Sequence, residues 1–219
     1  MAIASKLTAI GIIALSFAVG FLSFYLLSDL TREQKKLQVE EIISQLFNFV
    51  IFIWIGKILI NLSTFISDPL SILAYPSDSK SFYFAIVSIA LMLLYKSKQK
   101  NMQVIPLLDS FVHLFLISSF VYEFIQFVVV DNFYALGYLI LLSILIAIFF
   151  LLRERFTTLK MLTVIVIVWS IGMLILGFVQ PFVTVFGYIM APWFVGLFLV
   201  MSVGILTYKI RRGLHNGYY

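Results

Sequence analysis

Long apolar runs separated by short polar segments dominate this chain. A helix needs about 20 apolar residues to cross a bilayer, and most of these runs reach that length. The third predicted run is short, and the neighbouring apolar segment 69–75 is a candidate re-entrant or interfacial piece. Pro192 lies inside the last run and is expected to kink it, with neighbouring helices satisfying the freed carbonyl. The seven predicted spans are residues 7–28, 43–62, 82–95, 104–128, 134–152, 161–180 and 183–208.

Basic residues mark one side of the predicted membrane protein. Four basic clusters follow the first, third, fifth and seventh spans, and the positive-inside rule makes those loops cytoplasmic. Seven spans then place the N-terminus outside and the C-terminus in the cytoplasm. The expected fold is an all-α polytopic membrane helix bundle, with residues 1–219 as a single integral-membrane domain. The clusters are Arg32/Lys35/Lys36, Lys96/Lys98/Lys100, Arg153/Arg155/Lys160 and Lys209/Arg211/Arg212.

The composition agrees with this class and excludes several others. Hydrophobic residues make up 63% of the chain and charged residues 11%, which leaves too little polar surface for a soluble domain. The net charge of +5 comes from the basic clusters, so no nucleic-acid partner is expected. Without cysteine, thiolate chemistry and disulfides are excluded. His113 and His215 give no recognisable metal-ligand spacing, and neither a metal nor a cofactor is predicted.

Two charges lie inside predicted spans, where a charged side chain costs about 2.5–3.5 kcal/mol on insertion scales. They are Lys57 and Glu123, each five residues before the predicted outer end of its span. Because both spans run in the same direction, the two side chains are expected at similar depth and to form an interhelical ion pair. Two other interpretations remain open for Lys57: it snorkels to the outer headgroups, or it takes part in binding.

The fourth span carries a polar stripe. Asp109, His113, Ser119, Glu123 and Gln126 fall within about half of the helix circumference at 100° per residue. Such a stripe faces either other helices, through hydrogen bonds, or a wet cavity. At the inner end, Asp109 and His113 are predicted as a polar pair, with His113 bonded either to Asp109 or to a neighbouring helix.

Several short motifs recur in an order that resembles the bacterial prolipoprotein diacylglyceryl transferases. The resemblance covers about Ile12 to Arg212 and implies a seven-span protein of the bacterial cytoplasmic membrane, with phospholipid and lipoprotein as partners. The family moves a diacylglyceryl group from phosphatidylglycerol to a lipoprotein cysteine. The similar segments are Gly56-Lys57, Ser67-Asp68-Pro69-Leu70-Ser71-Ile72-Leu73 followed by Ser81-Phe82, Leu107-Leu108-Asp109, Gln180-Pro181, and Phe186-Gly187-Tyr188 through Pro192.

The departures from the family pattern concern the residues that the reaction requires. Expulsion of a phosphate requires cationic donors to stabilise the developing charge, but Glu123 stands where the family has an Arg. We therefore expect that the chain does not catalyse the family reaction. The other departures are Tyr83-Phe84-Ala85 for His-Gly-Gly, Gln126 for Asn, and apolar Gly172 and Leu176 near the family's next Arg and Glu.

The leading hypothesis is a non-enzymatic relative that binds a lipid, a lipoprotein or another membrane protein. An outer-leaflet groove would place Lys57, Tyr83, Glu123 and Gln126 near its outer end. One alternative is an active lipid- or lipoprotein-modifying transferase, with Tyr83 as proton donor and Glu123 as base. Another is a small-solute transporter, or the membrane subunit of one, with the polar stripe lining its path.

Overall fold

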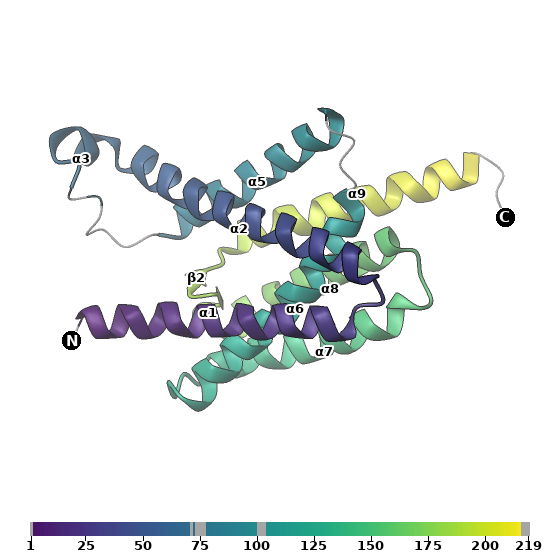
Figure 1. Ribbon diagram of the computed structural model, residues 1–219, viewed down its shortest axis with the longest axis horizontal. Helices are drawn as coiled ribbons and strands as arrows, with labels where there is room; N and C mark the ends of the chain where they lie inside the picture. Colours follow the sequence, from purple (N-terminus) through teal and green to yellow (C-terminus); the bar gives the residue numbers. More distant parts are fainter. Residues whose placement is uncertain (1, 71, 73–77, 100–103, 216–219) are drawn as a thin grey trace. The chain divides into compact units, whose positions relative to one another are not determined.

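The computed structural model describes residues 2–70, 72, 78–99 and 104–215. Within these residues, six helices are long and apolar enough to cross a membrane. The chain is therefore a helical, multi-pass membrane protein. It divides into two compact units, one formed by Met1–Asp29 with Leu108–Tyr219 and the other by Leu30–Leu107. Figure 1 shows the course of the chain through both.

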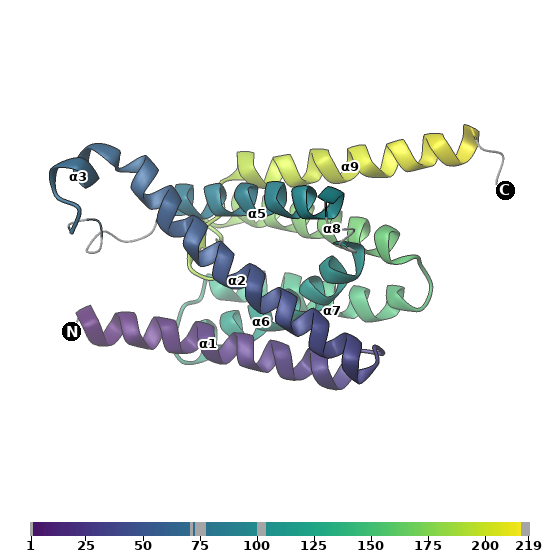
Figure 2. The same ribbon diagram turned by 45° about the horizontal axis from the view of Figure 1, so that its top comes forward.

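The smaller unit is a helical hairpin. Its helices are α2 (Arg32–Ile60), α3 (Leu62–Ser67) and α5 (Ser79–Gln99). Figures 1 and 2 both show α2 and α5 side by side. Helix α2 begins with a capping box, in which the side chain of Thr31 and that of Gln34 each bond to the other residue's backbone N–H.

Contacts along the two long helices of this hairpin show that they run antiparallel. Near the start of α2, the Glu41 carboxylate pairs with Lys96 near the end of α5, with 3.2 Å between Nζ and Oε1. Further along α2, the ring of Phe49 meets the edge of Phe82 with centroids 5.5 Å apart. The basic residues at the start of α2 and at the end of α5 therefore lie at the same end of this unit.

Helix α5 is longer than the predicted span 82–95. Asp78 caps it, because its Oδ1 accepts hydrogen bonds from the Ser81 backbone N–H at 2.9 Å and from the Ser81 hydroxyl at 2.6 Å. With 21 residues, α5 is long enough to cross a bilayer. Of the predicted re-entrant segment 69–75, residues 71 and 73–75 lie outside the described residues, so that prediction stays untested.

The larger unit contains the remaining long helices and one small hairpin. Helix α8 packs against both α7 and α9. The elements are α1 (Ala2–Leu27), α6 (Val104–Val128), α7 (Ala135–Arg153), α8 (Thr158–Val179), β1 (Thr184–Val185), β2 (Tyr188–Ile189) and α9 (Pro192–His215).

Helices α1 and α6 approach closely in this unit. A Cβ atom added at Gly20 of α1 would lie 2.1 Å from the Ser118 hydroxyl oxygen and 3.0 Å from the Leu114 carbonyl oxygen of α6. Glycine is therefore the residue that permits this spacing. Helix α6 is more buried than the other five candidate spans, because 39% of the residues in its apolar stretch are buried inside the protein.

The last predicted span is wrong over its first residues. Residues 184–189 form the antiparallel pair β1–β2, and the helix begins at Pro192. Pro192 therefore opens α9 and does not kink it. Proline suits the first helical position, because its missing N–H would have no intrahelical partner there. The described apolar part of α9, Pro192–Thr207, is shorter than the six long helices.

Candidate functional site

The predicted site residues belong to both units. Lys57 and Tyr83 lie on α2 and α5, and Glu123 and Gln126 lie on α6. The ion pair between Lys57 and Glu123 stays a prediction. A double-mutant cycle with single and double neutral replacements tests it, because additive losses of stability would mean that the two side chains do not interact.

Lys57 is buried inside the chain. Lys57 is only 3% exposed, and its Nζ lies 4.7 Å from the centroid of the Trp54 ring. An aromatic face stabilises an ammonium group through the negative potential above the ring. This burial disfavours the interpretation that Lys57 snorkels to the headgroups. Tyr83 is also buried, at 8% exposure.

Phe84 fills space between α2 and α5. A Cβ atom added at Gly56 would come within 2.9 Å of the Phe84 ring, so this glycine accommodates the aromatic side chain. The Phe84 side chain is thus packed into the helix interface of the smaller unit.

Glu123 is buried in the larger unit, with 2% of the residue exposed. It lies close enough to Tyr122 and Tyr138 for electrostatic interaction with both. The Tyr138 hydroxyl accepts a hydrogen bond from Nε1 of Trp169 at 3.0 Å. Among the described residues, Oε1 of Glu123 has no hydrogen-bond partner. Buried polar atoms without partners are uncommon, so this face of α6 retains unused hydrogen-bonding capacity.

His113 bonds to a neighbouring helix, which was one of the two predicted alternatives. Its Nε2 lies 3.2 Å from the hydroxyl oxygen of Ser23 on α1. The imidazole packs edge-on against Phe24 and Phe149. Oδ1 of Asp109, one turn before His113, is buried and has no hydrogen-bond partner among the described residues. Asp109 and His113, which were predicted as a polar pair, are therefore neighbours on one face of α6. The hydrogen bond of His113 is made to Ser23 of α1.

Arg153, which its sequence context marked only as part of a basic cluster, also contacts the end of α1. Its guanidinium donates a hydrogen bond to the Leu27 carbonyl at 3.2 Å and pairs with Oδ2 of Asp29 at 3.2 Å. Its charge also interacts with Asp109 and His113. Arg153 thereby joins the end of α7 to the end of α1. An Arg directly after an apolar run gives no sequence signal for such a contact.

Phe186 anchors the β1–β2 hairpin to α1 and α6, a contact that no local sequence pattern predicted. It forms the two-residue turn of the β1–β2 hairpin with Gly187, and both have positive φ, 49° and 84°. The ring of Phe186 stacks on Phe17 of α1 with centroids 5.1 Å apart, and meets Phe115 and Tyr122 of α6 at 6.0 and 5.3 Å. The hairpin is thus anchored to two helices that are distant in sequence.

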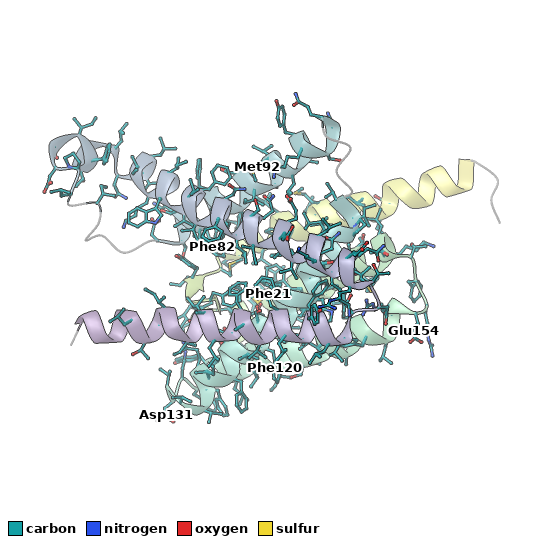
Figure 3. All side chains as sticks on the ribbon, viewed as in Figure 1. Phe21, Phe82, Met92, Phe120, Asp131 and Glu154 are labelled. Atoms are coloured by element: carbon teal, nitrogen blue, oxygen red, sulfur yellow. The ribbon has the colours of Figure 1, made fainter. Side chains whose placement is uncertain are left out.

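An open depression of about 370 Å³ lies where α6 ends. Its wall is mostly apolar, and Asp131 is its charged residue. Figure 3 shows Asp131 at one end of the larger unit and Glu154 at the other. Within the described part of the chain, no group of three or more His, Cys, Asp or Glu side chains is placed to hold a metal ion. The depression is lined by Phe127, Val128, Asp131 and Phe133.

Comparison of the chain with protein-family models, with curated proteins and with solved structures finds no match. The resemblance to prolipoprotein diacylglyceryl transferases therefore depends on the short motifs alone.

Proposed function

We propose that this protein is a non-enzymatic relative of the prolipoprotein diacylglyceryl transferases that binds a phospholipid in a bacterial cytoplasmic membrane. The N-terminus lies outside, and α9 supplies a seventh span. The contact between Arg153 and the end of α1 supports this orientation, because it brings a basic cluster and the α1–α2 junction to the same side.

One observation carries the non-enzymatic assignment. Residues 104–152 and 161–208 contain no Lys or Arg, while the buried charged residue of α6 is Glu123. A site that expels a phosphate group requires cations at the developing negative charge. The Glu123 carboxyl group supplies no positive charge for that role. Lys57 lies on α2 against the Trp54 ring, and one ammonium is a poor replacement for several guanidinium groups.

Lipid binding follows from the class of protein together with its packing. The described helices expose many large apolar side chains, as expected for a protein surrounded by acyl chains. Inside the larger unit, α6 presents buried polar atoms, such as Oε1 of Glu123 and Oδ1 of Asp109, for which the described residues offer no partner. A lipid that binds beside this helix supplies an apolar chain and hydrogen-bonding groups in one molecule.

Two measurements test the proposal. Expression in cells depleted of an active diacylglyceryl transferase is expected to leave lipoproteins unmodified, and restored modification would show that the chain is an enzyme. Purification in mild detergent followed by mass spectrometry of extracted lipid is expected to find retained phospholipid at a fixed ratio to protein. A protein that retains none would contradict lipid binding and favour a protein partner.

A transferase with altered chemistry is the second candidate. The observation in its favour is the burial of the Glu123 carboxyl group within the larger unit, because burial is one of the conditions that prepare a carboxyl group for acid–base chemistry. Comparison of membrane lipids from cells that express the native chain or Glu123→Gln decides between the candidates. A lipid product that disappears in Glu123→Gln alone would establish catalysis.

A further inference from the structure

The β1–β2 hairpin reaches deep into the larger unit. Its turn contacts Tyr122 and Phe115, which lie about 9 and 20 Å before the end of α6 at 1.5 Å per residue. The hydrocarbon core of a bilayer is about 30 Å thick, so the turn lies at membrane depth. Irregular backbone at that depth is tolerated where protein or a cavity surrounds it. Val185 and the Phe186 ring anchor the hairpin in this unit, whereas Gly187 and Ile189 are exposed, so one edge of the hairpin lies at the surface.

The turn holds Phe186 in an unfavourable backbone conformation. Positive φ suits glycine, which occupies the second position as Gly187, but is uncommon for a bulky residue. The conformation directs the Phe186 ring onto Phe17, Phe115 and Tyr122, and these aromatic contacts offset its cost. If the ring left this position, the backbone of Phe186 could relax to a favourable φ. The free energy that this relaxation releases would offset part of the free energy lost with the aromatic contacts.

The site under Phe186 has the chemistry of an acyl-chain site. Its walls are the rings of Phe17, Phe115 and Tyr122, which come from two helices. On α1, Leu15 and Leu22 are 55% and 59% exposed, so the bilayer adjoins the helix that carries Phe17. Acyl chains are the molecules present at this depth. The Tyr122 hydroxyl, which lies beside Gly187, is the single polar group of these three rings, and one hydroxyl is too little to replace the hydration of an ion or a headgroup.

We propose that Phe17, Phe115 and Tyr122 form a slot for one acyl chain of a membrane phospholipid, and that Phe186 occupies this slot until the chain displaces it. The proposal rests on the proposed function, because it names the part of the lipid that binds and the residues that receive it. The hairpin is then a strap that exchanges with its ligand, and its turn moves away when the lipid enters.

Photolabelling in a bilayer tests the slot. The full chain is reconstituted in phosphatidylglycerol vesicles that contain a small fraction of the same lipid with a diazirine at mid-chain. After irradiation, peptide mass spectrometry compares adducts on Phe115–Tyr122 with adducts on the lipid-facing residues Ile140 and Ile144 of α7, which are 54% and 50% exposed. Phe186→Ala is expected to raise this ratio about tenfold, because the aromatic contacts that keep the slot closed are lost.

The matched control is Phe182→Ala in the same segment, where the ring contacts Tyr134 with centroids 5.3 Å apart. This variant is expected to leave the ratio unchanged. If Phe186→Ala does not fold, Phe186→Leu keeps an apolar side chain but loses the ring contacts, and a severalfold rise is expected. An unchanged ratio in the folded Phe186 variant would overturn the slot.

The outcomes separate the slot from the proposed function. If phospholipid is retained on purification but the Phe186 variants behave like Phe182→Ala, the slot is wrong and lipid binding stands. If no phospholipid is retained, the proposed function fails as well. A diazirine lipopeptide supplies the third arm: labelling of Phe115–Tyr122 by the lipopeptide and not by the phospholipid would overturn the assignment of the occupant.

Discussion

The close approach of α1 and α6 at Gly20 makes a specific prediction about stability. Replacing Gly20 by Val places a branched side chain where a Cβ atom alone would be 2.1 Å from the Ser118 hydroxyl oxygen and 3.0 Å from the Leu114 carbonyl. The hydroxyl can rotate away, but the carbonyl belongs to the backbone of α6. The two helices must therefore separate. Gly11 on the same helix provides the matched control, because a Cβ atom added there meets nothing within 4 Å.

The expected loss of stability follows from packing. Forcing extra methyl groups into a packed interface costs about 1–3 kcal/mol. Separation of the helices also weakens the bond between His113 and Ser23, which lies one turn along α1, by about 0.6 kcal/mol. The change in helix propensity from Gly to Val is common to both positions and cancels. We expect Gly20→Val to lose about 2 kcal/mol more than Gly11→Val.

Thermal unfolding in detergent measures this difference. For a chain of this size, about 2 kcal/mol corresponds to a midpoint roughly 4–8 °C lower for Gly20→Val than for Gly11→Val. Retention of the folded peak on size-exclusion chromatography after heating gives an independent reading. Equal midpoints for the two variants would show that α1 and α6 are not in contact at Gly20, and the description of the larger unit would have to change.

Two further predictions concern side-chain contacts in the larger unit. Tyr138→Phe removes the acceptor for the Trp169 indole and is expected to lower stability by about 0.6–2 kcal/mol, whereas Tyr134→Phe at an exposed position is neutral in the same unfolding assay. Arg153→Gln costs little stability, about 0–1 kcal/mol, because its partner carboxylate is 87% exposed. Arg153→Gln is expected to speed amide hydrogen exchange at the end of α1, whereas Arg155→Gln is not. Equal exchange in both variants would contradict the contact between Arg153 and the end of α1.

Much of the fold was predictable because a bilayer enforces the length of each apolar run. The predicted span 104–128 coincides with α6, and 134–152 differs from α7 by one residue at each end. Span 82–95 was too short, since polar residues beside the membrane continue the helix and carry no hydrophobic signal. At 183–191, apolar composition suited a helix and a hairpin equally, so the hairpin was missed.

The candidate site was predictable only in part. The polar stripe of α6 follows from 100° per residue, and burial of Glu123 agrees with it. What each polar group bonds to depends on residues far away in the chain, as in the contact between His113 and Ser23. Arg153 and Phe186 had no local pattern that marked them, because their partners lie on other helices.

By itself the sequence determined the membrane class and the approximate ends of several helices, because the bilayer acts on every segment independently of its neighbours. Only the tertiary structure decided which rings surround Phe186, which helix receives His113 and where Arg153 is bound. Those contacts require two segments to meet in space, and such a meeting depends on the packing of whole helices, which no local pattern of hydrophobic residues encodes.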